Sequence, residues 1–153
     1  MRRLVLLGGP PGVGKSTVVA ELRGRFPNSV VLDADDYDSL PDVVAALRDC
    51  FETGSELVVL AWVFARAALY QPVLDSLSDL AERSLVLHLI ASPAALERRL
   101  AARGDPEKLD YARDRLALIR ELPFARIDTS ELSQAAAAER VAAAIQDWDS
   151  QSS

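Results

Sequence analysis

The sequence of 153 residues lacks several features that would indicate other classes of protein. Its single cysteine, Cys50, cannot form an internal disulfide and has no Cys or His nearby at zinc-ligand spacing, so we expect it to fill buried space. The longest apolar run, 57–65, is far shorter than the roughly 20 residues that cross a bilayer. The charged start at 1–3 leads into a Gly/Pro-rich turn without a cleavage site. We therefore expect no signal peptide, no membrane partner and a cytoplasmic protein.

Positive charge is also in short supply, with 17 Lys and Arg against 23 Asp and Glu and a net charge of −6. Binding long duplex nucleic acid requires many cationic phosphate contacts, so the composition disfavours a nucleic-acid partner but allows a local basic pocket. Half of the residues are hydrophobic and 26% are charged, which argues against intrinsic disorder. The length fits one domain, expected over 1–149, with a frayed tail at 150–153.

Apolar runs rich in β-branched residues alternate with segments of helical spacing, a pattern typical of βα units and a mainly parallel sheet. The expected strands are 4–7, 30–32, 57–61, 85–90 and 124–127. The expected helices are roughly 15–25, 41–52, 66–82, 93–103, 107–121 and 134–148. No internal repeat and no linker rich in Gly, Ser or Pro interrupts them. The pattern predicts an α/β fold: a three-layer α/β/α sandwich with a five-stranded parallel sheet.

The strongest motif is the segment Gly9-Pro10-Pro11-Gly12-Val13-Gly14-Lys15-Ser16, followed by Thr17. It fits G-x-x-x-x-G-K-[ST] and lies between an expected strand and an expected helix, which distinguishes a phosphate-binding P-loop from a chance glycine-rich turn. Glycines let the backbone N–H groups point inward, and the helix N-terminus adds positive charge where phosphates bind. Lys15 would then contact the outer phosphates, and the Ser16 hydroxyl would bind Mg²⁺. The motif predicts a P-loop NTPase fold that binds ATP.

Lysine is scarce, since Lys15 and Lys108 are the only two and arginine supplies the rest of the basic residues. A lysine at the P-loop position is informative because a compact ammonium on a flexible stem fits between phosphates. Motifs of other P-loop classes are missing. The N-K-x-D and D-x-x-G motifs of GTP switch proteins do not occur, and neither does the L-S-G-G-Q signature of transporter ATPases. The third expected strand runs into Trp62 without the acid that many P-loop enzymes use near Mg²⁺, which argues against a motor-type ATPase.

Four segments together resemble the small P-loop kinases of the nucleoside-monophosphate-kinase-like group, which includes gluconate kinase, shikimate kinase and chloramphenicol phosphotransferase. They are the P-loop, Asp33-Ala34-Asp35-Asp36, the helical stretch 96–103 and Ile127-Asp128-Thr129-Ser130. The resemblance covers nearly the whole chain, and gluconate kinase likewise lacks the acid after the third strand. It implies an ATP- and Mg²⁺-dependent phosphotransferase that moves the γ-phosphoryl group to a hydroxyl of a small molecule.

The acidic segment follows the second expected strand. Ligands bind at the carboxyl ends of parallel strands, and alternation along an extended segment puts Asp33 and Asp35 on the same side. One carboxylate can then hold Mg²⁺ while the other accepts the proton of an attacking hydroxyl. By resemblance we assign Asp35 as the catalytic base and Asp33 as a metal ligand beside Ser16. The alternative is an acidic, turn-forming loop.

Two arginines lie on the apolar stripe of the fourth expected helix. Arg99 and Arg103 share that stripe with Leu96 and Leu100, where guanidinium groups suit the charge on a transferred phosphoryl group. The resemblance implies a mobile lid around 99–115 whose arginines close over ATP, and we assign both to catalysis. Structural ion pairs with nearby acids are the alternative.

Three other features are less specific. The resemblance places Thr129 beside the adenine ring, although the residues alone indicate only a helix N-cap. Trp62, Phe64 and Arg66 alternate after the third strand and suit a wall of an acceptor pocket, but core packing explains the two aromatics nearly as well. His88 lies among apolar residues and is expected to be a satisfied core residue.

Two other functions stay open from the sequence. One is a nucleotide-binding regulatory or adaptor module without a small-molecule acceptor. The other is a kinase acting on a nucleic-acid 5′-hydroxyl, which the acidic balance and the lack of a basic, aromatic-studded stretch disfavour. The acceptor's identity and the choice between monomer and homodimer do not follow from the sequence.

Overall fold

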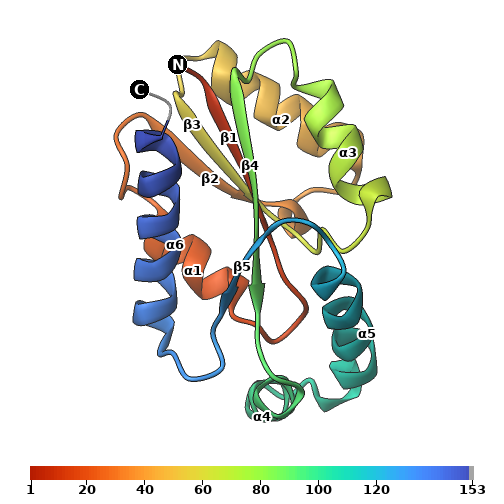
Figure 1. Cartoon of the computed structure of the whole chain (residues 1–153). Helices are drawn as coiled ribbons and strands as arrows, with labels where there is room; N and C mark the ends of the chain where they lie inside the picture. The colour runs from red at the N-terminus through yellow and green to blue at the C-terminus, as the bar shows by residue number, and fades with distance from the viewer. Residues whose placement is uncertain (152–153) are drawn as a thin grey trace.

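The computed structural model describes residues 1–151, and within that range five strands form one sheet (Figure 1). The order is β2-β3-β1-β4-β5, and every neighbouring pair is parallel. The strands are β1 (Arg3–Gly8), β2 (Ser29–Asp33), β3 (Leu57–Ala61), β4 (Arg83–Ile90) and β5 (Ala125–Asp128). The predicted five-stranded parallel sheet is therefore confirmed, with boundaries shifted by at most two residues.

Helices cover both faces of the sheet. They are α1 (Lys15–Leu22), α2 (Leu40–Glu52), α3 (Ala67–Ser76), α4 (Pro93–Ala102), α5 (Leu109–Arg120) and α6 (Gln134–Ser150), with short 3-10 turns η1 (Ala34–Asp36) and η2 (Pro106–Lys108). Figure 1 shows α1 and α6 side by side on one face, α2 and α3 on the other, and α4 and α5 toward the ends of the strands. The three-layer architecture is thus confirmed. No helix in the described part of the chain is long and apolar enough to cross a membrane.

The core is divided by the central strand β1. Leu4 and Leu6 belong to the hydrophobic cluster beneath α2 and α3, whereas Val5 and Leu7 belong to the cluster beneath α1 and α6. All four are completely buried, as expected for a parallel sheet covered on both faces. The sheet is therefore a rigid platform, and its carboxyl edge carries the loops that form the pocket described below.

Several helix ends differ from the expected ones; α1, for example, ends at Leu22 rather than near 25. Helix α3 ends at Ser76 rather than near 82, because Arg48 donates to the Ser76 carbonyl and the Ser78 hydroxyl donates to the Asp75 carbonyl. These carbonyls would otherwise accept from the next helical turn. Helix α6 continues through Ser150, inside the predicted frayed tail, because Arg83 donates to the Trp148 carbonyl and holds the helix end. Residues 152–153 of that tail lie outside the described residues.

Candidate active site

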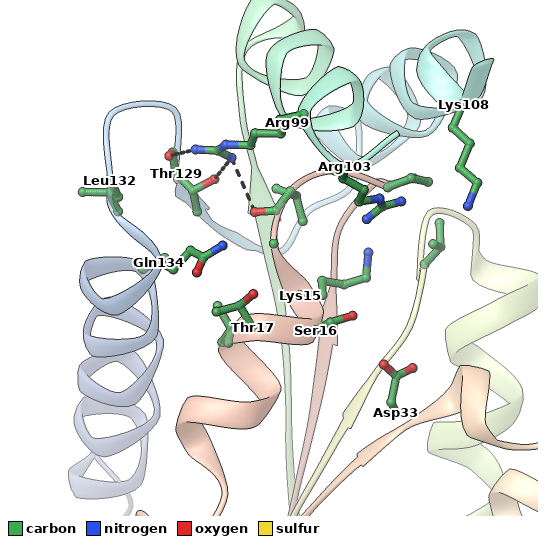
Figure 2. Close-up of a pocket in the computed structure, with 18 of the residues that line it drawn as sticks. Lys15, Ser16, Thr17, Asp33, Arg99, Arg103, Lys108, Thr129, Leu132 and Gln134 are labelled. Carbon is green, nitrogen blue, oxygen red and sulfur yellow. Dashed lines mark hydrogen bonds between the residues drawn. The ribbon is translucent and has the colours of Figure 1, made fainter. Parts of the chain in front are cut away.

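The P-loop between β1 and α1 forms the floor of a pocket of about 650 Å³ (Figure 2). Gly12 and Gly14 have φ values of +87° and +100°, a region that favours glycine. A Cβ atom on Gly12 would also lie 2.9 Å from Cγ of Leu100 in α4. The motif glycines therefore do two things: they allow the loop to curl, and they let α4 pack directly on it.

Helix α1 starts with its N–H groups open to the pocket. No side chain in residues 1–151 caps it after Gly14. Helices α2, α4 and α6, by contrast, are capped by the hydroxyls of Ser39, Ser92 and Ser133. The first N–H groups of a helix lack intrahelical acceptors and carry partial positive charge. The uncapped start of α1 is therefore suited to phosphate oxygens.

The Lys15 ammonium donates to the carbonyls of Gly9 and Pro10, at 2.5 and 3.2 Å. Burial lowers the pKa of Lys15 from 10.5 to about 8; Asp35 and Asp33 oppose this shift, and Arg103 adds to it. An arriving triphosphate would stabilise the charged form. Gly9 and Pro10 were predicted to contact the nucleotide, but they do not line the pocket. They are buried behind it and contribute the carbonyls that hold Lys15.

The two predicted carboxylates meet beside the P-loop. Asp33 ends β2, and its Oδ1 accepts a hydrogen bond of 2.9 Å from the Asp35 N–H, which starts η1. Both residues line the same pocket as Ser16 and Thr17. Their predicted placement is confirmed, whereas their roles as metal ligand and base stay predictions.

Arg103 lies above Lys15 at the end of α4 (Figure 2). Its Nε donates to the Asp105 carboxylate at 2.7 Å, so the structural ion pair considered as an alternative is present. Arg103 is nevertheless exposed and lines the pocket, and its charge acts on Lys15. This placement fits a cation that meets a nucleotide's phosphates.

Arg99 has a different setting from the one expected. One terminal nitrogen, Nη1, donates to Thr129 Oγ1 at 3.0 Å and has a longer contact of 3.5 Å with the Val13 carbonyl. The other, Nη2, donates to the Thr129 carbonyl (Figure 2). Thr129 is 1% exposed, and its hydroxyl donates in turn to the Ile90 carbonyl. Arg99 thus ties α4 to the P-loop and to the loop after β5. Arg99 also lines the pocket, and its contact with the transferred phosphoryl group stays a prediction.

Comparison with known proteins supports the same architecture. No protein-family model and no curated protein matches the sequence. Among solved structures, the tunicamycin resistance protein of Deinococcus radiodurans has 22% identity and a TM-score of 0.71, over 95% of this chain and 96% of that one. A protein of Chloroflexus aurantiacus described as a candidate kinase has 19% identity and a TM-score of 0.57, over 95% and 97%. The protein APE1195 has 17% identity and a TM-score of 0.62, over 95% and 96%.

The chain has a P-loop kinase-like fold.

Further residues, to which the sequence assigned no role, line the pocket of this P-loop kinase-like fold. They are Val18, Val63, Ala102, Lys108, Leu132, Ser133, Gln134 and Ala137. Most come from the start of α6 or from single positions that tertiary packing brings to the edge of the sheet. Only Lys108 carried a signal in the sequence, as one of two lysines among 17 basic residues.

Of the two explanations left open for the aromatic residues after β3, core packing is confirmed for Phe64. That ring is completely buried in the core beneath α2 and α3, where Trp62 meets it edge-on at 5.8 Å between ring centroids. Val63 lines the pocket instead, and Arg66 lies outside its lining. The alternation failed because β3 ends at Ala61 and the chain then bends.

His88 lies in β4 and is completely buried, which confirms a core position. Burial, then the positive charges of Lys15 and Arg126, lower its pKa from 6.5 to about 4, so the ring is neutral near pH 7. The expected hydrogen bond is missing: within the described chain neither ring nitrogen has a partner. The ring fills space beside Gly8, where a Cβ atom would lie 2.3 Å from Nδ1.

Proposed function

We propose that this chain is an ATP- and Mg²⁺-dependent phosphotransferase that moves the γ-phosphoryl group to a hydroxyl of a small molecule. One observation carries the proposal: a single pocket contains the P-loop with Lys15, the carboxylates Asp33 and Asp35, and Arg103. Phosphoryl transfer depends mainly on positioning and on neutralising the charge of the moving group. This set of groups supports both.

The strand order supports a direction for the nucleotide. Thr129 follows β5 on one side of the P-loop, and Asp33 ends β2 on the other side. With the phosphates of ATP over the P-loop, the adenine would lie near Thr129. The terminal phosphoryl group would then lie near Asp33 and Asp35. The acceptor would then enter from the β2 side.

The available donors fit Mg²⁺. This ion prefers oxygen ligands, keeps several waters and usually binds through one or two carboxylates together with substrate phosphates. Ser16 offers its hydroxyl oxygen. Asp33 offers its second carboxylate oxygen, because Oδ1 already accepts the hydrogen bond from the Asp35 N–H. Bound there, the ion would neutralise phosphate charge. Because residues 1–151 contain no group of three or more His, Cys, Asp or Glu that could hold a metal, we expect the ion to bind with the nucleotide.

Each remaining residue has a defined task in the transfer. Lys15 and Arg103 stabilise the negative charge of the γ-phosphoryl group. Asp35 accepts the proton of the acceptor hydroxyl as its oxygen forms a bond to the γ-phosphorus. The bond between that phosphorus and the bridging oxygen breaks, and its electron pair leaves with ADP.

The surface favours a small acceptor over the other two functions. Among described residues, the large hydrophobic side chains that are exposed are Met1 and Tyr111, which gives little support to a docking surface for an adaptor apart from a small apolar groove between α2 and α3 at Leu40, Val44 and Pro72. The net charge of −6 disfavours a nucleic-acid acceptor. The neighbours described as a tunicamycin resistance protein and a candidate kinase are in keeping with a small-molecule kinase.

The test combines calorimetry with ATP consumption in the presence of Mg²⁺, using hydroxyl-bearing metabolites and antibiotics as acceptors. We expect heat on titration with ATP, acceptor-dependent ADP formation, and loss of both in Lys15→Ala. An absence of binding heat in the wild-type protein would contradict the proposal at its first step. Binding without transfer to any acceptor would favour the adaptor.

A further inference from the structure

Lys108 is the second of the chain's two lysines, and both line the same pocket. It ends η2, directly before α5, and its side chain is 49% exposed. Its ammonium lies 3.8 Å from the Asp105 carboxylate, farther than a normal hydrogen bond. Because an ammonium has three N–H donors and this long ion pair occupies at most one of them, Lys108 can still bind a ligand.

The position of Lys108 separates it from the phosphate cations. Figure 2 shows Arg103 above Lys15, whereas Lys108 extends over the segment after β3, far from Thr129. Arg103 is close enough to Lys15 to lower its pKa. Lys108 therefore faces the half of the pocket on the β2 and β3 side, where the acceptor would enter.

Opposite charges face each other across that half. Figure 2 shows Asp33 at the base of this half and Lys108 above it, and Asp35 and Val63 belong to the same pocket lining. An acceptor whose hydroxyl meets Asp35 would be repelled if it carried a negative group on the same side. A negative group at its other end would instead meet Lys108, and the two contacts would orient the molecule.

Building on the proposed function, we infer that Lys108 binds an anionic group of the acceptor. The acceptor is then a small hydroxyl compound that carries a carboxylate or a phosphate. A charged donor such as Lys108 discriminates against an analogue that lacks the matching group to the extent that the bound acceptor excludes water from the ammonium. Arg66, which the sequence suggested for the acceptor wall, lies outside the pocket lining, so Lys108 supplies the positive charge on this side.

The first experiment needs no acceptor. The affinity for Mg²⁺ and a non-hydrolysable ATP analogue is measured by calorimetry in the wild type, Lys108→Gln and the matched lid variant Arg103→Gln. We expect Lys108→Gln to bind within about twofold of the wild type, and Arg103→Gln to bind about tenfold more weakly. If Lys108→Gln weakens binding as much as Arg103→Gln, Lys108 belongs to the triphosphate site and the inference is overturned.

The second experiment compares acceptors in pairs that differ in charge: glycerate with glycerol, threonate with threitol, and ribose 5-phosphate with ribose. We expect the anionic member of an accepted pair to have a kcat/KM about tenfold or more higher. Lys108→Gln should remove this preference through the acceptor KM, and Lys108→Arg should restore part of it. The carboxylate and phosphate pairs distinguish the two kinds of anion.

Two results would count against the inference in different ways. A preference for neutral members, or one that survives in Lys108→Gln, would overturn the assignment of Lys108 while leaving the kinase proposal intact. Transfer to no member of any pair, despite tight nucleotide binding, would contradict the transfer function, and the acceptor assignment would fall with it.

Discussion

The two sides of the pocket are built differently. On the side of β4 and β5, Arg99, Thr129 and Ile90 form a continuous hydrogen-bonded chain around a threonine that is 1% exposed. On the side of β2 and β3, Asp35 and Lys108 are exposed. The first side is organised before any ligand arrives, whereas the second has charges that are free to reorient.

This difference suggests a division of labour. A hydrogen-bonded, buried wall is already ordered, so binding a ligand there costs less conformational entropy. This suits the nucleotide, which is the same in every reaction. Exposed charges on a turn between two helices can adjust to an acceptor and then to its product. Substitutions on the two sides should therefore change different measured quantities.

The largest effect is expected on the open side. Asp35→Asn removes the group that accepts the hydroxyl proton but keeps the shape of the side chain. A general base typically contributes ~10²–10⁴-fold, so kcat should fall by that order while the affinity for Mg²⁺-ATP is retained. Steady-state kinetics and calorimetry on the same preparation check this. Full activity on an accepted substrate would show that Asp35 is not the base.

The next effect concerns the bonded side. Arg99→Gln removes the link between α4 and Thr129. We expect ATP to bind about tenfold more weakly, because the side of the pocket that would contact the adenine becomes less ordered. Inorganic tripolyphosphate, which has no nucleobase, should bind to Arg99→Gln with the same affinity as to the wild type. An equal loss for both ligands would instead assign Arg99 to the phosphates, as the sequence suggested, and the contrast between the two sides would break.

The sequence predicted those parts of the site that follow directly from strand ends. The P-loop follows β1 and Asp33 is the last residue of β2, so covalent connection places both at the same edge of the sheet. Helical spacing placed Arg99 correctly on the inward face, but spacing does not identify the partner on another loop. Thr129 became that partner through tertiary packing.

Other parts had no usable local signal. After β3 the chain bends, so strand periodicity no longer reports which side chain faces the pocket, and Val63 rather than Phe64 lines it. Gln134 reaches the pocket because α6 packs beside α1, a long-range contact that no local pattern encodes. The fold was therefore more predictable than the lining of its pocket.

A pH effect should be confined to the phosphate end. Burial lowers the pKa of Lys15 to about 8 in the free protein, and a bound triphosphate should raise it. Below pH 8 the ammonium is already charged, so affinity should be nearly constant. Above pH 8 binding must take up a proton, and affinity should fall by up to about tenfold per pH unit. Calorimetry with ATP and with tripolyphosphate should show the same fall, and Lys15→Arg, which stays charged, should not.

The smallest effects compare the stability of the two sides with a matched pair of variants. Thr129→Val keeps the shape but removes the hydroxyl that links Arg99 to Ile90, so we expect the free energy of unfolding to fall by about 1–3 kcal/mol. Asp105→Asn breaks only the exposed pairs with Arg103 and Lys108, and its midpoint of thermal unfolding should stay within a degree or so of the wild type. If Asp105→Asn proved as destabilising as Thr129→Val, the turn between α4 and α5 would be held as firmly as the side of the pocket with Thr129. The charges on that turn would then not be free to reorient.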